Sequence, residues 1–289
     1  MKYGSMSIIF REQNGRTEHI GYVEALTRMR AAGFETADLN LCQICAHKTM
    51  LHTEDWKREA EKIGETAKNL RIDLVQCHLP FKSAKVKWKT PEDYAYYIEM
   101  FYRAIDVASL LLIPWAVIHP ERDPSGERTE EQMIARNRKE FDKLIEYALS
   151  KNLGIAFENM RTGYSSEAGQ LCRLIDSYGD ERVGACWDTG HAHTAYAGAD
   201  QREALLTVGK RLRCTHIDDN FADKDLHLLP WEGTADWQSI ISALREIEYK
   251  GALILEPSVN YRSPDCLKDE NARHALEVVK RLAETYENG

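Results

Sequence analysis

The sequence predicts an α/β protein, a single (β/α)8 barrel of the TIM-barrel class that occupies residues 1–289 as one domain. Three observations predict this fold. Short β-rich runs alternate with longer helix-periodic segments eight times along the chain. Strict alternation favours a parallel sheet, and eight such units close into a barrel. No glycine-rich phosphate turn follows the first run, which disfavours an open doubly wound sheet.

The predicted strands are short apolar runs bounded by polar or turn residues. We place them at residues 3–10, 36–39, 73–79, 116–119, 154–158, 183–188, 213–217 and 252–256. Helical periodicity fills the intervals between them, with apolar faces that repeat over residues 94–108 and 272–286.

Local signals mark several helix ends. Thr90 stands directly before a proline and Thr129 stands three residues before a glutamine, and both patterns are typical of helix starts. Gly33, Gly154 and Gly251 each precede a predicted strand, where a left-handed residue often ends a helix.

The composition argues against several classes of protein. Acidic residues number 46 and basic residues 38, and the net charge of −8 disfavours a nucleic-acid partner. The longest apolar stretch, residues 108–118, is too short to span a bilayer, so we expect no membrane association. The amino terminus lacks the pattern of a signal peptide. Seven scattered cysteines are typical of a reduced compartment, and we expect a cytoplasmic protein.

Polar residues end six consecutive predicted strands, at the edge where parallel α/β folds place their active sites. A single histidine at a strand end is more often a hydrogen-bonded structural residue. Converging carboxylates are harder to explain in that way, because the charges repel one another and lose hydration. A divalent cation usually holds such groups together. The ionisable residues at these ends and in the loops that follow are His78, His119, Glu158, Asp188, His191, His216, Asp225, His227 and Glu256.

We expect a divalent metal ion as the cofactor. Four of these residues end successive strands and would form an oxygen-rich site with one imidazole: Glu158, Asp188, His216 and Glu256. Such a site suits Mn²⁺ in the first place, and also Co²⁺, Mg²⁺ or Zn²⁺. The five remaining residues make the set rich enough in nitrogen for two or three zinc ions. The sequence leaves the number of ions open.

The motifs around these residues resemble those of the xylose isomerase-like barrel superfamily. This superfamily includes sugar isomerases and epimerases, inosose and dehydroshikimate dehydratases, and AP endonucleases of the endonuclease IV type. By this resemblance the four strand-end residues match the shared metal quartet, and the other five match the extra ligands of a trinuclear zinc centre. The epimerases usually read Pro-Gly-x-Gly where this chain carries Trp231. The matching pieces are residues 158–159, 188–191, 216–220, 225–227, 233–237 and 256–257.

The resemblance implies a metal-dependent isomerase, epimerase or related dehydratase for a small sugar, sugar phosphate or polyol-ketone. An enediolate-type intermediate would form when one of Glu158 and Glu256 removes a proton beside the carbonyl, and the other would return a proton. His191 would fix a substrate hydroxyl. The predicted substrate contacts are His78, His119, Trp88 and Trp231.

An AP endonuclease is the alternative that the sequence leaves open. All nine candidate ligands suit it, and residues 82–89 place four lysines around Trp88, as in a loop that binds a nucleic-acid strand. A solvated loop explains the same lysines more simply, and a sugar phosphate would also attract them. A non-catalytic relative is disfavoured, because the quartet is complete.

Two further features remain open at this level. Cys42 and Cys45 have the spacing of a zinc knuckle, with His47 and His52 close behind. The irregular spacing of the set favours a lid or a substrate-contact loop over a structural zinc site. A homo-oligomer is compatible with the sequence, although no apolar stripe identifies an interface.

Overall fold

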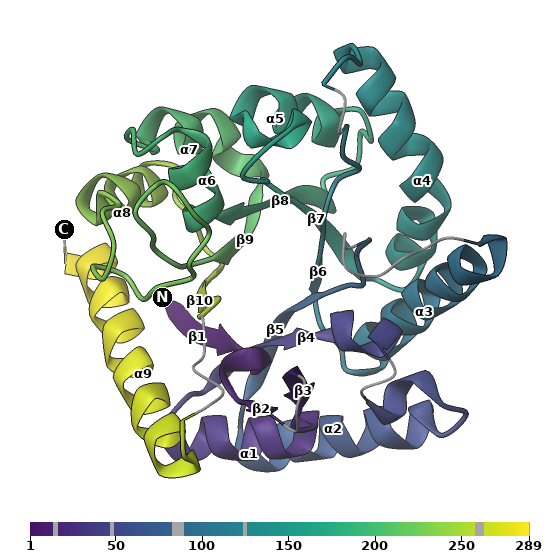
Figure 1. Cartoon of the computed structure of the whole chain (residues 1–289), viewed down its shortest axis with the longest axis vertical. Coiled ribbons are helices and arrows are strands. Elements are labelled where there is room, and N and C mark those ends of the chain that lie inside the picture. The colour runs from purple at the N-terminus through teal and green to yellow at the C-terminus, as the bar shows by residue number, and fades with distance from the viewer. Residues whose placement is uncertain (14–16, 47–48, 83–89, 124–125, 258–262, 289) are drawn as a thin grey trace.

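The computed structural model describes residues 1–13, 17–46, 49–82, 90–123, 126–257 and 263–288. At its centre lies an eight-stranded sheet whose neighbouring strands are parallel, in the order β10-β1-β4-β5-β6-β7-β8-β9 (Figure 1). A parallel bridge between Ile217, the residue after the last strand of this order, and Leu255 in β10 links the two ends of the sheet and closes the barrel. The predicted (β/α)8 barrel is therefore confirmed. Its strands are β1 (Lys2–Met6), β4 (Thr36–Asn40), β5 (Asp73–His78), β6 (Trp115–Ile118), β7 (Gly154–Glu158), β8 (Val183–Asp188), β9 (Leu212–His216) and β10 (Ala252–Leu255).

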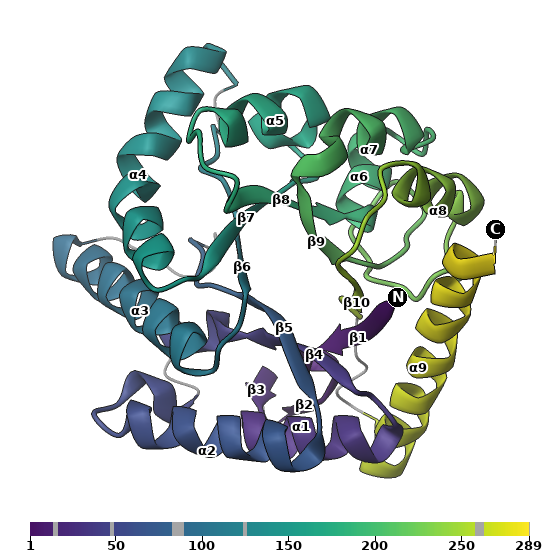
Figure 2. The ribbon, with the colours of Figure 1, turned by 180° about the vertical axis from the view of Figure 1, so that it is seen from behind.

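Helices surround the strands as an outer ring (Figures 1 and 2). A small antiparallel hairpin of β2 (Arg11–Gln13) and β3 (Thr17–His19) follows the first strand. No helix in the described part of the chain has the length and hydrophobicity that crossing a bilayer requires. The α-helices are α1 (Tyr22–Ala32), α2 (Trp56–Leu70), α3 (Pro91–Leu110), α4 (Glu130–Ser150), α5 (Ala168–Asp176), α6 (Thr189–Ala195), α7 (Arg202–Val208), α8 (Trp237–Glu246) and α9 (Asp265–Asn288). The 3-10 helices are η1 (Ser7–Ile9), η2 (Leu41–Ala46), η3 (Met50–His52), η4 (Tyr164–Ser166) and η5 (Gly209–Arg211).

The predicted helix starts are confirmed. Thr90 and Thr129 cap α3 and α4, and each forms a reciprocal capping box with the third residue of its helix. Of the three glycines, Gly33 ends α1 in the left-handed conformation, with φ of 107°. The other two are not helix caps. A Cβ on Gly154 would lie 2.4 Å from the Trp115 ring, and one on Gly251 would lie 2.2 Å from the hydroxyl of Tyr249, so close packing accounts for both.

The first strand is shorter than predicted. It ends at Met6, whereas the sequence predicts a strand over residues 3–10. Ser7 begins η1, and its Oγ accepts a hydrogen bond from the backbone N–H of Asn40 at 3.1 Å. This side-chain acceptor takes the place of a backbone bond between β1 and β4, so the apolar residues 8–10 leave the sheet.

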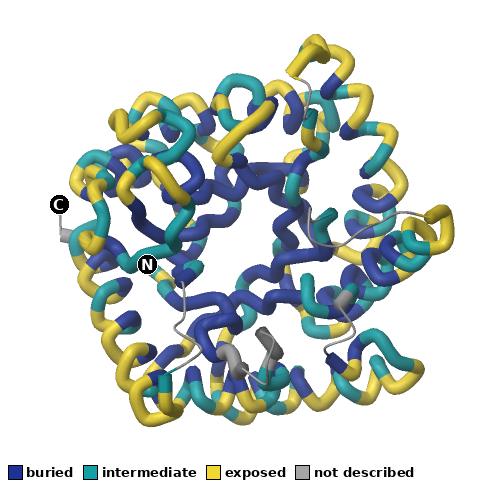
Figure 3. The backbone as a smooth tube through the Cα atoms, viewed as in Figure 1, coloured by how far each residue is buried: buried dark blue, intermediate teal, exposed yellow. Residues whose placement is uncertain are grey.

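The inner wall of the barrel is buried (Figure 3). Inside it, Val117, Ala156, Cys186 and Cys214 form a small apolar cluster, and the main apolar core packs between the strands and the helices. Ala156 lies two positions before Glu158, and Cys186 and Cys214 have the same spacing to Asp188 and His216. Side chains two positions apart in a strand point to the same side of the sheet, so the apolar and the ionisable side chains share one side. The cluster is therefore an apolar floor beneath the candidate site.

Candidate metal centre and active site

Four predicted metal ligands meet at the carboxyl end of the barrel. Glu158, Asp188 and His216 are the last residues of β7, β8 and β9, and Glu256 directly follows β10. One ligand atom from each lies within 4.8 Å of the others. The Nδ1 atom of His216 lies 2.8 Å from Glu158 Oε1 and 3.1 Å from Glu256 Oε2. The structure therefore assembles the predicted set, which we call the quartet.

The surroundings of the quartet fit a divalent cation. Glu158, Asp188 and His216 are at most 1% exposed. The Oδ2 atom of Asp188 is buried and has no hydrogen-bond partner among the described residues. Carboxylates this close and this deeply buried repel one another unless a positive charge lies among them. Three carboxylates and one imidazole suit Mn²⁺, Mg²⁺, Co²⁺ or Zn²⁺.

A second ligand cluster shares Glu158 with the quartet. The Nε2 atoms of His78 and His119 are 3.0 Å apart, and they lie 3.3 Å and 2.8 Å from Glu158 Oε2. The Nδ1 atom of His78 lies 2.8 Å from the Leu79 carbonyl oxygen, and a hydrogen on Nδ1 would leave the lone pair of Nε2 available to a cation. These separations are close to the roughly 3.3 Å that a tetrahedral zinc imposes on its ligand atoms.

A third cluster involves the loop after β9 and lies next to His191. The Nε2 atom of His191 is 3.3 Å from Asp225 Oδ2, and the Nε2 atom of His227 is 3.5 Å from Asp225 Oδ1. Asp218 offers another carboxylate within 4.8 Å of ligand atoms of Asp225 and His227. Asp218 is not among the site residues predicted from the sequence. The sequence does contain an indication of it. Asp218 lies two positions after His216, and side chains two positions apart in an extended chain point to the same side.

A family comparison agrees with this geometry. The model of the xylose isomerase-like TIM barrel family matches residues 24–282. The chain belongs to this family. The matched range contains all nine candidate ligands, so the whole site lies within the part that this xylose isomerase-like barrel shares with its relatives.

Three relatives show how far the resemblance extends. An uncharacterized protein of Sinorhizobium fredii, y4fM, is 31% identical over 163 residues, which are 55% of this chain and 52% of that protein, so the chain spans about half of its length. A D-psicose 3-epimerase of Enterocloster bolteae is 24% identical over 249 residues, 82% of this chain and 77% of the relative. The crystal structure of IOLI protein with a bound zinc atom has a TM-score of 0.74 at 16% identity and covers 98% of this chain and 99% of its own. At that identity the likeness shows the fold.

Burial and neighbouring charges shift the pKa values in the quartet of this xylose isomerase-like barrel. Burial raises the pKa of Asp188 to about 7, although His191 opposes it. For Glu256, burial is outweighed by the charge of His216 and by a hydrogen bond from it, and the pKa falls to about 2. For Glu158, burial is outweighed by His216 and His119, which hold the pKa well below its usual range. Burial also opposes the charged form of His216, but nearby negative groups raise its pKa well above the usual value.

We expect the affinity for Mn²⁺ to rise with pH between pH 6 and pH 8. A metal ligand must lose its proton before it binds, and the carboxyl of Asp188 has a pKa of about 7 in the metal-free protein. One such proton changes the apparent affinity about tenfold between pH 6 and pH 8. The raised pKa of His216 acts in the same direction. Titration calorimetry at constant ionic strength measures this dependence, and a flat or falling affinity would contradict the assignment of Asp188 as a ligand.

Trp231 has an unusual backbone conformation. Its φ is 70°, in the left-handed region where glycine is free of steric cost. Its N–H donates to Asp219 Oδ2 at 3.1 Å, and its half-exposed ring lies 6.3 Å from the ring of Trp237. These contacts hold the loop after β9 in place. The predicted substrate contact through Trp231 stays a prediction, and Trp88 lies outside the described residues.

Lys82 is the one lysine of the lysine-rich segment 82–89 that lies among the described residues. Its Nζ lies 2.9 Å from Glu121 Oε1 and 2.6 Å from Glu140 Oε1. The charge of Lys82 is therefore paired within the protein, and binding a phosphate would require breaking both ion pairs. The lysines at 85, 87 and 89 lie outside the described residues.

Cys42 lies beside the second cluster. Its Sγ is 3.1 Å from His78 Nδ1 and 3.1 Å from the Leu79 carbonyl oxygen. Cys42 and Cys45 are free thiols, and the ligand clusters found among the described residues include neither of them. A zinc knuckle is thus not assembled within the described part of the chain, and His47 lies outside it. The predicted lid or substrate-contact role of this segment stays a prediction.

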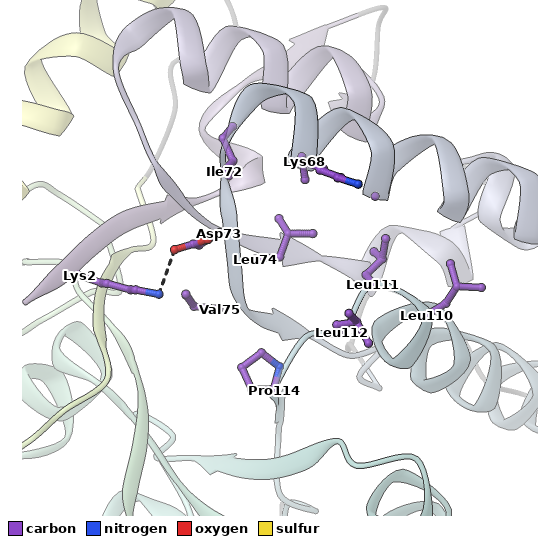
Figure 4. Close-up of a pocket in the computed structure, with 12 residues that line it drawn as sticks. Lys2, Lys68, Ile72, Asp73, Leu74, Val75, Leu110, Leu111, Leu112 and Pro114 are labelled. Atoms are coloured by element: carbon purple, nitrogen blue, oxygen red, sulfur yellow. Dashed lines mark ion pairs between the residues drawn. The ribbon is translucent and has the colours of Figure 1, made fainter.

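A depression at the opposite end of the barrel lacks comparable chemistry (Figure 4). It has a volume of about 550 Å³, and the starts of β1 and β5 and the end of α3 contribute to its wall. The ion pair drawn there joins Lys2 Nζ to Asp73 Oδ2 at 2.9 Å, and both side chains are mostly exposed. Leucines form much of the remaining lining. Among the described residues, convergent metal ligands therefore mark the carboxyl end of the barrel.

Proposed function

We propose that this protein is a divalent-metal-dependent isomerase or epimerase for a small sugar, sugar phosphate or polyol-ketone. The quartet at the carboxyl end of the barrel is the observation that carries the proposal, because its ligand atoms lie within 4.8 Å of one another and are largely buried. The kinship with a D-psicose 3-epimerase supports a carbohydrate substrate. We propose Mn²⁺ as the working ion, with Co²⁺, Mg²⁺ and Zn²⁺ as alternatives.

Glu158 and Glu256 differ in how accessible their carboxylates are for proton transfer. A bound divalent ion supplies positive charge that stabilises negative charge on a carbonyl and an adjacent hydroxyl oxygen. Glu256 is the carboxylate better placed to take the proton beside the carbonyl, because its side chain is 18% exposed. Glu158 is 1% exposed, and both of its oxygens contact imidazoles. We assign to Glu158 the return of a proton to the opposite side of that carbon. Glu158 first receives this proton from solvent through His119, whose Nε2 lies 2.8 Å from its Oε2, and Glu256 releases the substrate proton to solvent, so atoms and charge balance.

His191 is proposed to orient a substrate hydroxyl. Its Nδ1 lies 3.0 Å from the Asn159 carbonyl oxygen, and its Nε2 faces Asp225. Burial lowers the pKa of His191, but Asp188 and Asp225 outweigh it and raise the pKa to about 10, so both ring nitrogens carry hydrogens at neutral pH. The Nε2–H group can then be shared between Asp225 and a substrate oxygen. His78, His119 and Trp231 remain the proposed contacts to other parts of the substrate.

Solvent exchange of the proton beside the carbonyl tests this function. The protein is loaded with Mn²⁺ and incubated in D2O with a ketohexose, a ketohexose phosphate and an inosose in separate samples. Epimerisation, isomerisation and dehydration all begin with removal of this proton, so NMR should detect deuterium in at least one of the three compounds. Glu256→Gln should abolish the exchange, because the amide cannot accept the proton.

The control is Glu167→Gln, which makes the same chemical change at an exposed residue outside the three clusters. It should exchange deuterium at the wild-type rate. The proposal fails if the folded, metal-loaded wild-type protein exchanges no deuterium into any of the three compounds.

An AP endonuclease remains the second candidate, because the structure brings all nine candidate ligands together in adjoining clusters. The internal pairing of Lys82 and the net charge of −8 weaken this candidate. Incubation of the Zn²⁺-loaded protein with duplex DNA that carries one abasic site tests it. Strand cleavage at that site would favour the nuclease over the sugar enzyme.

A further inference from the structure

Asp38 is a buried carboxylate that the proposed reaction does not use. It lies in β4, a strand that does not pair with β9, and it is fully buried. Its Oδ2 accepts a hydrogen bond from Gln76 Nε2 at 2.8 Å and lies 3.6 Å from His216 Nε2. Its Oδ1 has no hydrogen-bond partner among the described residues. Burying a carboxyl group with one unpaired oxygen is unfavourable, so the position of Asp38 inside the protein needs an explanation.

The two ring nitrogens of His216 face different groups. Nδ1 faces the quartet, 2.8 Å from Glu158 Oε1 and 3.1 Å from Glu256 Oε2. Nε2 faces Asp38 and has no hydrogen-bond partner among the described residues. A neutral imidazole that binds a cation through one nitrogen carries its hydrogen on the other. A cation bound at Nδ1 therefore requires the hydrogen on Nε2, where it points toward Asp38.

We propose that Asp38 is a positioning residue for the metal centre. Its carboxylate accepts the Nε2–H of His216, so that Nδ1 is the ring nitrogen presented to the ion. This inference rests on the proposed function, because it requires that the quartet binds a divalent ion. A movement of about 0.5 Å brings the two atoms from 3.6 Å to ordinary hydrogen-bond length.

Two of the four other candidate ligand histidines provide a comparison. The Nδ1 of His78 faces the Leu79 carbonyl at 2.8 Å, and the Nδ1 of His191 faces the Asn159 carbonyl at 3.0 Å and lies 3.5 Å from Asp188 Oδ2. In both cases the acceptor within hydrogen-bond distance is a neutral carbonyl, whereas no carbonyl lies at that distance from His216 Nε2 among the described residues and the group that faces it is the Asp38 carboxylate. A carboxylate behind an imidazole makes the ligating nitrogen more basic, and such outer partners change metal affinity by about 10- to 100-fold. This effect gives a reason for a carboxylate at this position.

Gln76 fixes the orientation of the Asp38 carboxylate. Its Nε2 donates to Asp38 Oδ2 at 2.8 Å and also lies 3.3 Å from the Thr215 carbonyl oxygen. Thr215 directly precedes His216 in β9, so one amide group ties the carboxylate to the strand that carries the imidazole. The hydrogen bonds thus connect β4, β5 and β9 behind the metal centre.

Asp38→Asn tests the inference by removing the charge while keeping the size of the side chain. Co²⁺ is titrated into the metal-free protein and followed by visible absorption, which reports both affinity and ligand geometry. We expect the variant to fold and to bind Co²⁺ about 10- to 100-fold more weakly, with a changed spectrum. The matched control is Thr215→Val, which removes a buried hydroxyl next to His216 and should lower stability while leaving the Co²⁺ spectrum and affinity unchanged.

Wild-type affinity and spectrum in Asp38→Asn would overturn the inference and leave the proposed function intact. Failure of the wild-type protein to bind any divalent ion would instead overturn the proposed function and this inference with it. A second measurement needs no variant. In the Zn²⁺-loaded protein with ¹⁵N-labelled histidine, NMR should find the hydrogen of His216 on Nε2. A hydrogen on Nδ1 would overturn the inference.

Discussion

Glu158→Gln is expected to abolish metal binding and proton exchange together. Glu158 belongs both to the quartet and to the cluster with His78 and His119, and its two oxygens lie 2.8 Å from His216 Nδ1 and from His119 Nε2. An amide of the same size removes the charge from the centre of both clusters. Loss of one partner of a buried charged pair costs about 3 to 5 kcal/mol, or roughly a hundredfold to several thousandfold in affinity.

Elemental analysis and a Mn²⁺ titration measure this effect, and circular dichroism checks that the variant is folded. Glu256→Gln makes a useful comparison, because it alters the quartet but leaves His78, His119 and Glu158 in place. It should retain more bound Zn²⁺ than Glu158→Gln. If Glu158→Gln holds Mn²⁺ as tightly as the wild-type protein, the assignment of the quartet as the metal site is wrong.

The barrel could be predicted from local patterns because its strands are short and separately marked. The bounds of β7 and β8 match the prediction, since each is an apolar run that ends at an ionisable residue. The error at β1 came from treating residues 8–10 as a continuation of the strand. The hydrogen bond from Asn40 to Ser7 joins residues 33 positions apart, and the hydrophobic periodicity of a single segment cannot predict such a contact.

The quartet could be predicted for a related reason. Carboxyl ends of neighbouring parallel strands meet at one edge, so the order of the strands alone places a strand-end residue at that edge. Asp38 lies inside a strand, where alternation alone does not tell whether an acidic side chain faces helices or the barrel interior. Its partners Gln76 and His216 come from other strands, and only the closed sheet brings them together.

The loop after β9 shows a further limit of sequence reasoning. Asp218 and Asp219 are adjacent, alike in chemistry and both fully buried. Neither carboxylate oxygen of Asp218 has a hydrogen-bond partner among the described residues, whereas the carboxylate of Asp219 accepts four hydrogen bonds. One donor is the indole of Trp237, at 2.8 Å and 18 positions away. The different roles of the two aspartates therefore depend on tertiary contacts.

These two aspartates should respond oppositely to substitution. Asp219→Ala leaves the buried N–H of Asn220 and the indole N–H of Trp237 without their acceptor, and it also removes the acceptor for the N–H groups of Trp231 and Ala235. Each buried donor left unpaired costs roughly 1 to 3 kcal/mol, so the free energy of unfolding should fall by about 3 to 5 kcal/mol. Urea denaturation of the metal-free protein measures this loss.

Asp218→Asn should leave the metal-free protein at least as stable as the wild type. Burial, followed by the charges of Asp188 and Glu256, raises the pKa of Asp218 well above its usual value. The folded state therefore binds more protons than the unfolded state once the pH exceeds the ordinary pKa of an aspartate, and wild-type stability falls as the pH rises toward the raised pKa. An asparagine does not titrate, so the advantage of the variant should grow between pH 5 and pH 8. Equal losses of stability in Asp218→Asn and Asp219→Ala would show that both carboxylates are structural and that Asp218 does not belong to a ligand cluster.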